Sequence, residues 1–105
     1  MSEIKVSVTF RHTQPTAALK RYAEQKIQRI GKYFDHPVEA HVILAVDGRE
    51  RQLAELDLHT RGTTILAKEE HHDLYAAIDL AIDKVERQIT KQKEKIKLER
   101  RKSSA

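Results

Sequence analysis

The spacing of the apolar residues changes along this chain, and each change predicts a new secondary-structure element. Residues 4–10 alternate between apolar and polar side chains, which is the two-residue period of a half-buried strand. From Thr16, a residue type that caps helices, the apolar positions recur every three or four residues instead. This stripe predicts an amphipathic helix, which Gly31 and the proline-containing segment 35–37 should end. Its members are Leu19, Ala23, Ile27 and Ile30.

Three more strands and a second helix are predicted in the rest of the chain. Residues 41–46 are apolar on both faces, as in an interior strand, and residues 53–59 alternate again. A fourth strand covers residues 63–68, and Asp-Gly and Arg-Gly turns separate the last three strands. Asp73 then caps a long helix, whose inward stripe is Leu74, Ile78, Ala81, Ile82, Val85 and Ile89.

The predicted order is β-α-β-β-β-α, an α+β fold with a four-stranded mixed sheet. A right-handed helical crossover leaves the first two strands parallel, and the short turns make the last three an antiparallel meander. The two amphipathic helices should share one face of the sheet in a two-layer domain. We expect a single domain over residues 1–98. Residues 99–105 offer nothing to bury and should form a short, basic, disordered tail.

Composition limits the classes of protein to which this chain could belong. Its 105 residues suffice for one modest core, and no apolar run approaches the roughly 20 residues that span a bilayer. The N-terminus has no apolar signal-peptide core, so a cytoplasmic protein is expected. The absence of cysteine excludes disulfides, thiolate zinc sites and a cysteine nucleophile. With both apolar stripes used by the sheet, the free domain should be a monomer.

The positive charge is concentrated at the C-terminal end. Residues 84–105 contain nine Lys or Arg and three Glu, a local charge of +6, whereas the remaining residues carry eleven basic and thirteen acidic side chains. Such a concentration favours a polyanionic partner.

On a helical wheel with Ile78 at zero, the second helix has two charged strips. Asp79, Asp83, Glu86 and Glu94 lie at roughly 80° to 160°, and Lys84, Arg87, Lys91 and Lys95 lie at roughly 180° to 260°. One interpretation is a solvated helix with ion pairs between successive turns. The alternative is a polyanion-binding surface, since a helix built only for solubility would mix the two signs.

The first helix is also basic on its outward side, where Glu24 is its one acidic residue. If both helices lie on one face of the sheet, their outer sides should merge into one basic plateau. The candidate RNA-binding residues are Arg11, Lys20, Arg21, Lys26, Arg29, Lys32, Lys84, Arg87, Lys91 and Lys95.

The open face of the sheet is a poorer candidate for RNA binding. It should carry Glu55, Asp57 and His59 beside the polar residues of the first strand, with no aromatic side chain on which bases could stack. Phe10, the one strand aromatic, should point into the core. An RNA-binding surface formed by the two protein helices favours folded RNA, which it would contact through the RNA backbone.

Catalysis finds little support in the sequence, and no cofactor is expected. There is no glycine-rich phosphate loop, and the serines lie near the termini or within a strand. His71 and His72 are adjacent, should point in different directions and lack a third spaced ligand, so no metal site is expected. Tyr75 could pack at the start of the helix or stack on a nucleotide.

Two segments of the long helix resemble a known family. Residues 73–79 (DLYAAID) and 83–89 (DKVERQI) are similar to the signature of the bacterial ribosome hibernation-promoting factors, the family of protein Y (ribosome-associated inhibitor A). The resemblance extends from Ile4 to about Lys95. It implies a fold similar to double-stranded RNA-binding domains and a non-enzymatic role in stationary phase or stress. It also implies binding to 16S rRNA in the decoding channel of the small (30S) ribosomal subunit, over the mRNA and tRNA sites.

Some features depart from the family pattern. Phe10 stands where a glycine usually precedes the basic residue, and Pro15 replaces an aliphatic residue, so the loop between them should have its own shape. The chain ends soon after the long helix and resembles the short form, which is associated with paired, inactive 70S ribosomes (100S particles). The sequence leaves open whether the protein promotes or opposes this pairing.

Two other functions stay open at this point. A protein–protein adaptor could use the acidic strip of the second helix to bind a basic partner. A generic double-stranded RNA-binding module would bind random duplexes as tightly as ribosomes.

Overall fold

The computed structural model describes residues 4–48 and 51–103, with side chains described as far as Gln92. Four strands form one sheet: β1 (Ile4–Arg11), β2 (Val38–Asp47), β3 (Arg51–Thr60) and β4 (Thr63–His71). Two helices complete the domain: α1 (Ala17–Gln28), which continues into the 3-10 helix η1 (Arg29–Tyr33), and α2 (Leu74–Ser103). The predicted order and fold class are therefore confirmed.

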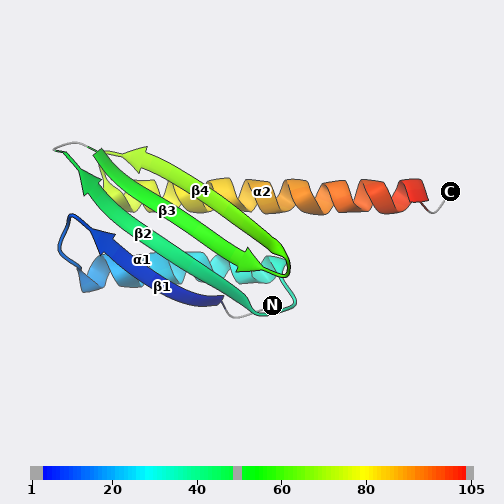
Figure 1. The fold of residues 1–105 in the computed structure, drawn as a ribbon, viewed down its shortest axis with the longest axis horizontal. Coiled ribbons are helices and arrows are strands. Elements are labelled where there is room, and N and C mark those ends of the chain that lie inside the picture. The colour runs from blue at the N-terminus through cyan, green and yellow to red at the C-terminus, as the bar shows by residue number, and fades with distance from the viewer. Residues whose placement is uncertain (1–3, 49–50, 104–105) are drawn as a thin grey trace.

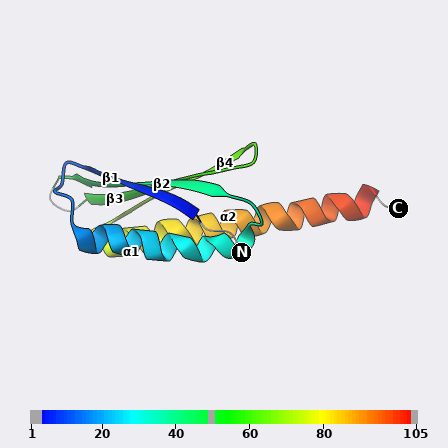
Figure 2. The same ribbon diagram turned by 90° about the horizontal axis from the view of Figure 1, so that it is seen from below.

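The sheet has the strand order β1-β2-β3-β4 (Figure 1). β1 pairs with β2 in parallel, with Ile4 opposite Val38, and the two later pairs are antiparallel. Figure 2 shows both helices on one face of the sheet, with α2 projecting beyond its edge. The right-handed crossover rule and the short turns thus predicted the topology correctly.

The core fills the space between the sheet and the helices. The inward-facing residues of the strands and both helical stripes meet there, because the helices cover one face of the sheet. Phe10 packs against this core, as predicted. The largest fully buried side chains are Ile27, Ile30, Leu44, Leu58, Ile65, Ile78, Val38, Val42 and Val85.

Two caps confirm the predicted starts of the helices. The Thr16 hydroxyl accepts a hydrogen bond from the Leu19 amide at 3.2 Å, and the Asp73 carboxylate accepts one from the Tyr75 amide at 3.1 Å. The end of the first helix differs from the prediction, because α1 gives way to the tighter η1 from Arg29. Strands β2, β3 and β4 are also longer than predicted, because their pairing with neighbours continues past the predicted ends. In β2 the added residues include Val38 and Ala40, which are buried in the core.

The long helix α2 extends further than predicted, into residues that were expected to form a disordered tail. α2 continues through residues 99–103, where four of the five residues are Glu, Arg or Lys, which favour helix without needing burial. The remainder of that tail, residues 104–105, lies outside the described residues. Within the described ranges, no helix is long and apolar enough to cross a lipid bilayer.

Candidate nucleic-acid interface

A line of polar contacts joins α1 to α2 along the outer side of the helical layer. The Tyr22 hydroxyl contacts both carboxylate oxygens of Asp79, at 2.8 and 2.9 Å, and Lys26 Nζ lies 3.9 Å from the same carboxylate. Tyr22 and Lys26 are one helical turn apart, so both reach the same side chain on α2.

A second tie lies further along the two helices. The hydroxyl of Tyr33, in η1, donates to Glu86 Oε2 at 3.1 Å, and Arg29 Nη2 lies 3.9 Å from Glu86 Oε1. Together with the first tie, this forms what we call the helix seam: Tyr22, Lys26, Arg29 and Tyr33 against Asp79 and Glu86. The seam places much of the acidic strip of α2 against basic and hydroxyl groups of α1.

The prediction of one merged basic plateau is therefore wrong. The apolar stripe of α2 faces the sheet, and this rotation turns Asp79 and Glu86 towards α1, between the basic residues of the two helices. The outer face consists of two basic strips on either side of the helix seam, in which the two carboxylates are paired with Lys26 and Arg29. Sequence alone placed each strip on its own helix but did not show which strip faced the neighbouring helix.

The basic strip of α2 divides between the outer surface and the edge of the sheet. Arg87 is exposed, and its Nε donates to the backbone oxygen of Asp83 at 3.5 Å, while Lys91 is exposed one turn later. Lys84 turns towards β4, where its Nζ lies 3.7 Å from Glu69 Oε1. The side chain of Lys95 lies outside the described residues, although its backbone belongs to α2.

The remaining candidate RNA-binding residues, from the first half of the chain, divide between the helical layer and the end of β1. Lys20 and Arg21 are exposed on α1, and Lys32 is exposed on η1, where its Nζ lies 5.1 Å from the centre of the Tyr33 ring. Arg11 ends β1 on the side opposite to the core, since its neighbour Phe10 packs inward. The structure therefore does not bring Arg11 together with the basic residues of the helices.

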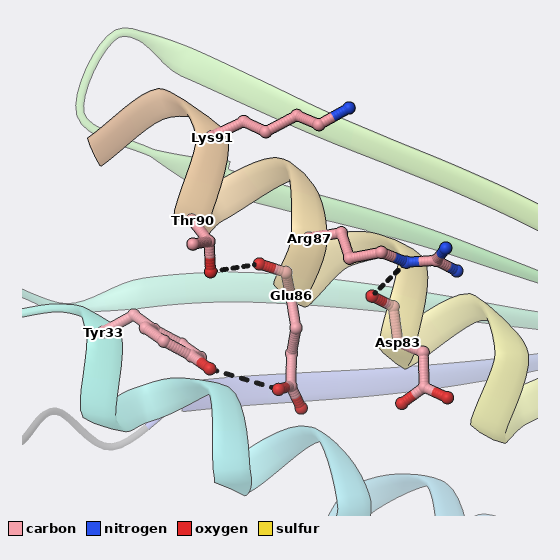
Figure 3. A pocket seen from close by; sticks show the side chains of 6 residues that line it. All are labelled: Tyr33, Asp83, Glu86, Arg87, Thr90 and Lys91. Atoms are coloured by element: carbon pink, nitrogen blue, oxygen red, sulfur yellow. Dashed lines mark hydrogen bonds between the residues drawn. The ribbon is translucent and has the colours of Figure 1, made fainter. Parts of the chain in front are cut away.

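A groove opens where η1 lies beside the middle of α2 (Figure 3). Its volume is about 590 Å³, within the range of small-ligand sites. Its lining combines an aromatic ring, two carboxylates, a hydroxyl and two cations: Tyr33, Asp83, Glu86, Thr90, Arg87 and Lys91. The Thr90 hydroxyl donates to the backbone oxygen of Glu86 at 2.9 Å, which fixes one wall.

The open face of the sheet has the predicted polar residues. Glu55 Oε1 lies 3.5 Å from Lys68 Nζ, and Asp57 Oδ1 lies 3.1 Å from His59 Nε2. The Thr9 hydroxyl and His41 Nε2 are 2.7 Å apart across the parallel pair. Acids and imidazoles occupy the two central strands, so this face offers less positive charge to a polyanion than the helical layer does.

The two adjacent histidines do not point in different directions, as the sequence led us to expect. Their rings stack with centroids 4.1 Å apart, because His71 ends β4 and His72 begins the bend towards α2. His71 Nδ1 accepts a hydrogen bond from the Asp73 amide, so it helps to shape that bend. Among the described residues, no three His, Cys, Asp or Glu side chains gather closely enough to hold a metal ion.

The contacts of Tyr22 and Tyr33 in the helix seam were not predicted from the sequence. A signal for them exists, since Tyr22, Lys26, Arg29 and Tyr33 follow one another at steps of four, three and four residues. This is the spacing of one side of a helix, opposite an acidic strip of similar spacing on α2. Tyr75 packs edge-on against the Tyr22 ring with centroids 4.9 Å apart, which favours the packing interpretation of that residue.

The seam predicts a particular pH dependence of stability. Donation to Asp79, with some burial, raises the pKa of Tyr22 from 10.0 to about 12. The unfolded chain loses this proton near pH 10, whereas the folded protein keeps it, so the free energy of unfolding should fall as pH rises from 10 to about 12. Chemical denaturation across this range should show a shallower fall for Tyr22→Phe. An unchanged slope in that variant would contradict the assignment.

Comparison with known proteins places this geometry in a family. The family model described as Sigma 54 modulation protein / S30EA ribosomal protein matches residues 6–97. The ribosome hibernation promoting factor of Azotobacter vinelandii is 40% identical over 92 residues, which cover 88% of this chain and 85% of that protein. The factor of the same name from Escherichia coli K12 is 35% identical over 94 residues, covering 90% and 98% respectively.

Solved structures agree with the fold. The crystal structure of the Thermus thermophilus Protein Y N-terminal domain superposes with a TM-score of 0.77 at 33% identity, covering 86% of this chain and 98% of that one. A ribosomal subunit interface protein from Coxiella burnetii superposes with a TM-score of 0.75 at 25% identity, with the same coverage.

Proposed function

Because the chain belongs to the Sigma 54 modulation protein / S30EA ribosomal protein family, we propose that it binds ribosomes and keeps them in an inactive, hibernating state. The family resemblance of residues 73–79 and 83–89 is thereby confirmed. Relatives named ribosome hibernation promoting factor match 85–98% of their own length, which supports the same role here. The role is that of a cytoplasmic, non-enzymatic factor, and the free protein is a monomer.

The proposed contact surface is the outer side of the helical layer. The observation that carries this proposal is the exposure of basic residues on both helices: Lys20, Arg21 and Lys32 on one side, Arg87 and Lys91 on the other. The partner is 16S rRNA of the small subunit, at the decoding channel, where the bound protein excludes mRNA and tRNA. Two strips separated by a seam suit folded RNA, which offers phosphates on more than one backbone segment.

The structure weakens the adaptor alternative. An adaptor would need the acidic strip of α2 to be free for a basic partner, yet Asp79 is held by α1 and Glu86 by η1. Of the strip members with described side chains, this leaves Asp83 alone unpaired. Glu94, the last member of that strip, lies outside the residues with described side chains.

Co-sedimentation tests the proposal directly. The purified protein should pellet with 30S subunits and inhibit cell-free translation, and random duplex RNA added in equal mass should not displace it. If added duplex RNA prevents the protein from pelleting with 30S subunits, the generic RNA-binding module is favoured instead. A sucrose gradient of 70S ribosomes with the protein added would then decide whether it promotes or opposes ribosome pairing.

A further inference from the structure

Asp83 is an acidic residue on the outer side of the helical layer, beside the helix seam. Asp79 is held by α1 and Glu86 by η1, but the Asp83 carboxylate makes no hydrogen bond or ion pair with any residue that the structure describes. Asp83 is exposed, and its neighbour Arg87 donates to its backbone oxygen. Asp83 therefore presents a free negative charge on the surface to which we assign RNA binding.

The carboxylate lines the groove between η1 and α2, together with two cations and an aromatic ring. Figure 3 shows Asp83 and Glu86 extending from α2 towards the helix that carries Tyr33, whereas Arg87 and Lys91 lie on the side of α2 further from that helix. Arg87 and Lys91 are one turn apart, a rise of about 6 Å along α2, so both can approach one phosphate group. The volume of about 590 Å³ is sufficient for one nucleotide.

An unpaired carboxylate on a surface that binds RNA is unfavourable for binding. It repels phosphates and lowers the affinity for any polyanion, unless it accepts a hydrogen bond from the ligand. An ionised aspartate only accepts, so a ligand that gains affinity from this carboxylate offers a donor. RNA offers two kinds: the ribose 2′-hydroxyl and the N–H groups of the bases.

We propose that this groove binds one nucleotide of the RNA, its phosphate against Arg87 and Lys91 and a hydrogen-bond donor against Asp83. The donor is a 2′-hydroxyl or a base N–H group, and it comes from an unpaired nucleotide if it is on the Watson–Crick edge of a base. This inference rests on the proposed function, because it names the contact that one part of the helical surface makes with RNA. The basic residues around it contact the phosphates of any RNA backbone, whereas Asp83 selects a nucleotide that offers a hydrogen-bond donor.

The test asks whether the affinity for 30S subunits rises or falls when the negative charge of Asp83 is removed. Asp83→Ala removes a negative charge, so for a merely solvated acid the affinity for 30S subunits should stay constant or rise. For an acceptor of an RNA donor, the affinity should fall about tenfold or more despite the gain in net positive charge. Asp83→Asn keeps an acceptor without the charge and should fall between the wild type and Asp83→Ala.

Glu24→Ala is the matched control. Glu24 lies on α1, makes no hydrogen bond or ion pair with the described residues, does not line the groove, and its loss changes net charge equally. The affinity of the Glu24→Ala protein for 30S subunits should stay within about threefold of the wild-type value or rise. If Asp83→Ala behaves as Glu24→Ala does, Asp83 accepts nothing from RNA and the inference is overturned.

Chemical probing of 16S rRNA in the 30S complexes distinguishes the two sources of the donor. A nucleotide protected by the wild type and by Glu24→Ala, but not by Asp83→Ala, is the one expected in the groove. Loss of protection from 2′-hydroxyl acylation assigns the ribose, and loss from reagents that modify base edges assigns the base. If wild-type protein does not pellet with 30S subunits, the proposed function fails too; if it pellets and no protection depends on Asp83, this inference alone fails.

Discussion

Replacing Lys84, Arg87 and Lys91 together with alanine is expected to weaken binding to 30S subunits by about 3 kcal/mol or more, over a hundredfold in Kd. All three side chains are exposed, and the latter two line the groove beside the helix seam. Each one that contacts a phosphate contributes a charge-assisted hydrogen bond, which is stronger than a neutral one. Co-sedimentation and inhibition of cell-free translation should decline together.

Folding should survive this triple replacement. Alanine favours helix at least as well as Lys and Arg, and exposed positions tolerate substitution within about 0.5 kcal/mol. The one ion pair lost from the described residues, Lys84 with Glu69 at 3.7 Å, joins side chains that are 46% and 30% exposed. Exposed pairs of this kind contribute about 1 kcal/mol at most. The thermal midpoint should therefore move by only a few degrees.

A second triple variant separates the position of the charges from their number. Lys5, Arg51 and Lys68 lie on the open face of the sheet, so replacing them with alanine removes the same net charge from the opposite side. Its affinity should fall far less than that of the helix variant. If the sheet variant loses binding and the helix variant keeps it, the proposed orientation on the ribosome is wrong.

Affinity for 30S subunits should depend steeply on salt. If six or more basic residues contact phosphates, the association constant should drop about a thousandfold or more between about 50 and 200 mM salt, because each contact releases condensed counterions. The described side chains supply enough candidates on the helical layer, and these are Lys20, Arg21, Lys26, Arg29, Lys32, Lys84, Arg87 and Lys91. Pelleting assays over a salt series give the slope directly.

The helix variant gives this prediction an internal check. With up to three phosphate contacts removed, the slope of log K against log salt should become shallower, whereas the sheet variant should keep the wild-type slope. A nearly flat wild-type response would mean that neither basic strip contacts phosphates. The protein would then bind through other groups, and the helical surface would lose its assigned role.

Sequence alone determined the elements and their order, because the information lies in nearby residues. The two-residue period of residues 4–10 and the stripe ending in Ile30 each identify the side that must be buried. Four such strands and two such helices can bury those sides together in few ways, and the handedness of the crossover leaves essentially one. The apolar stripe of α2 was correct throughout, since its six members are all buried.

Tertiary structure decided what lies beside each charged strip. Burying the stripe of α2 fixes its rotation, but whether Asp79 meets water or Tyr22 depends on where α1 lies and how it is rotated. Those quantities follow from packing between residues more than fifty positions apart, which no local period records. The separation of the basic strips by the helix seam, the exposure of Asp83 and the turn of Lys84 towards Glu69 all arise from that packing, so only the folded chain reveals them.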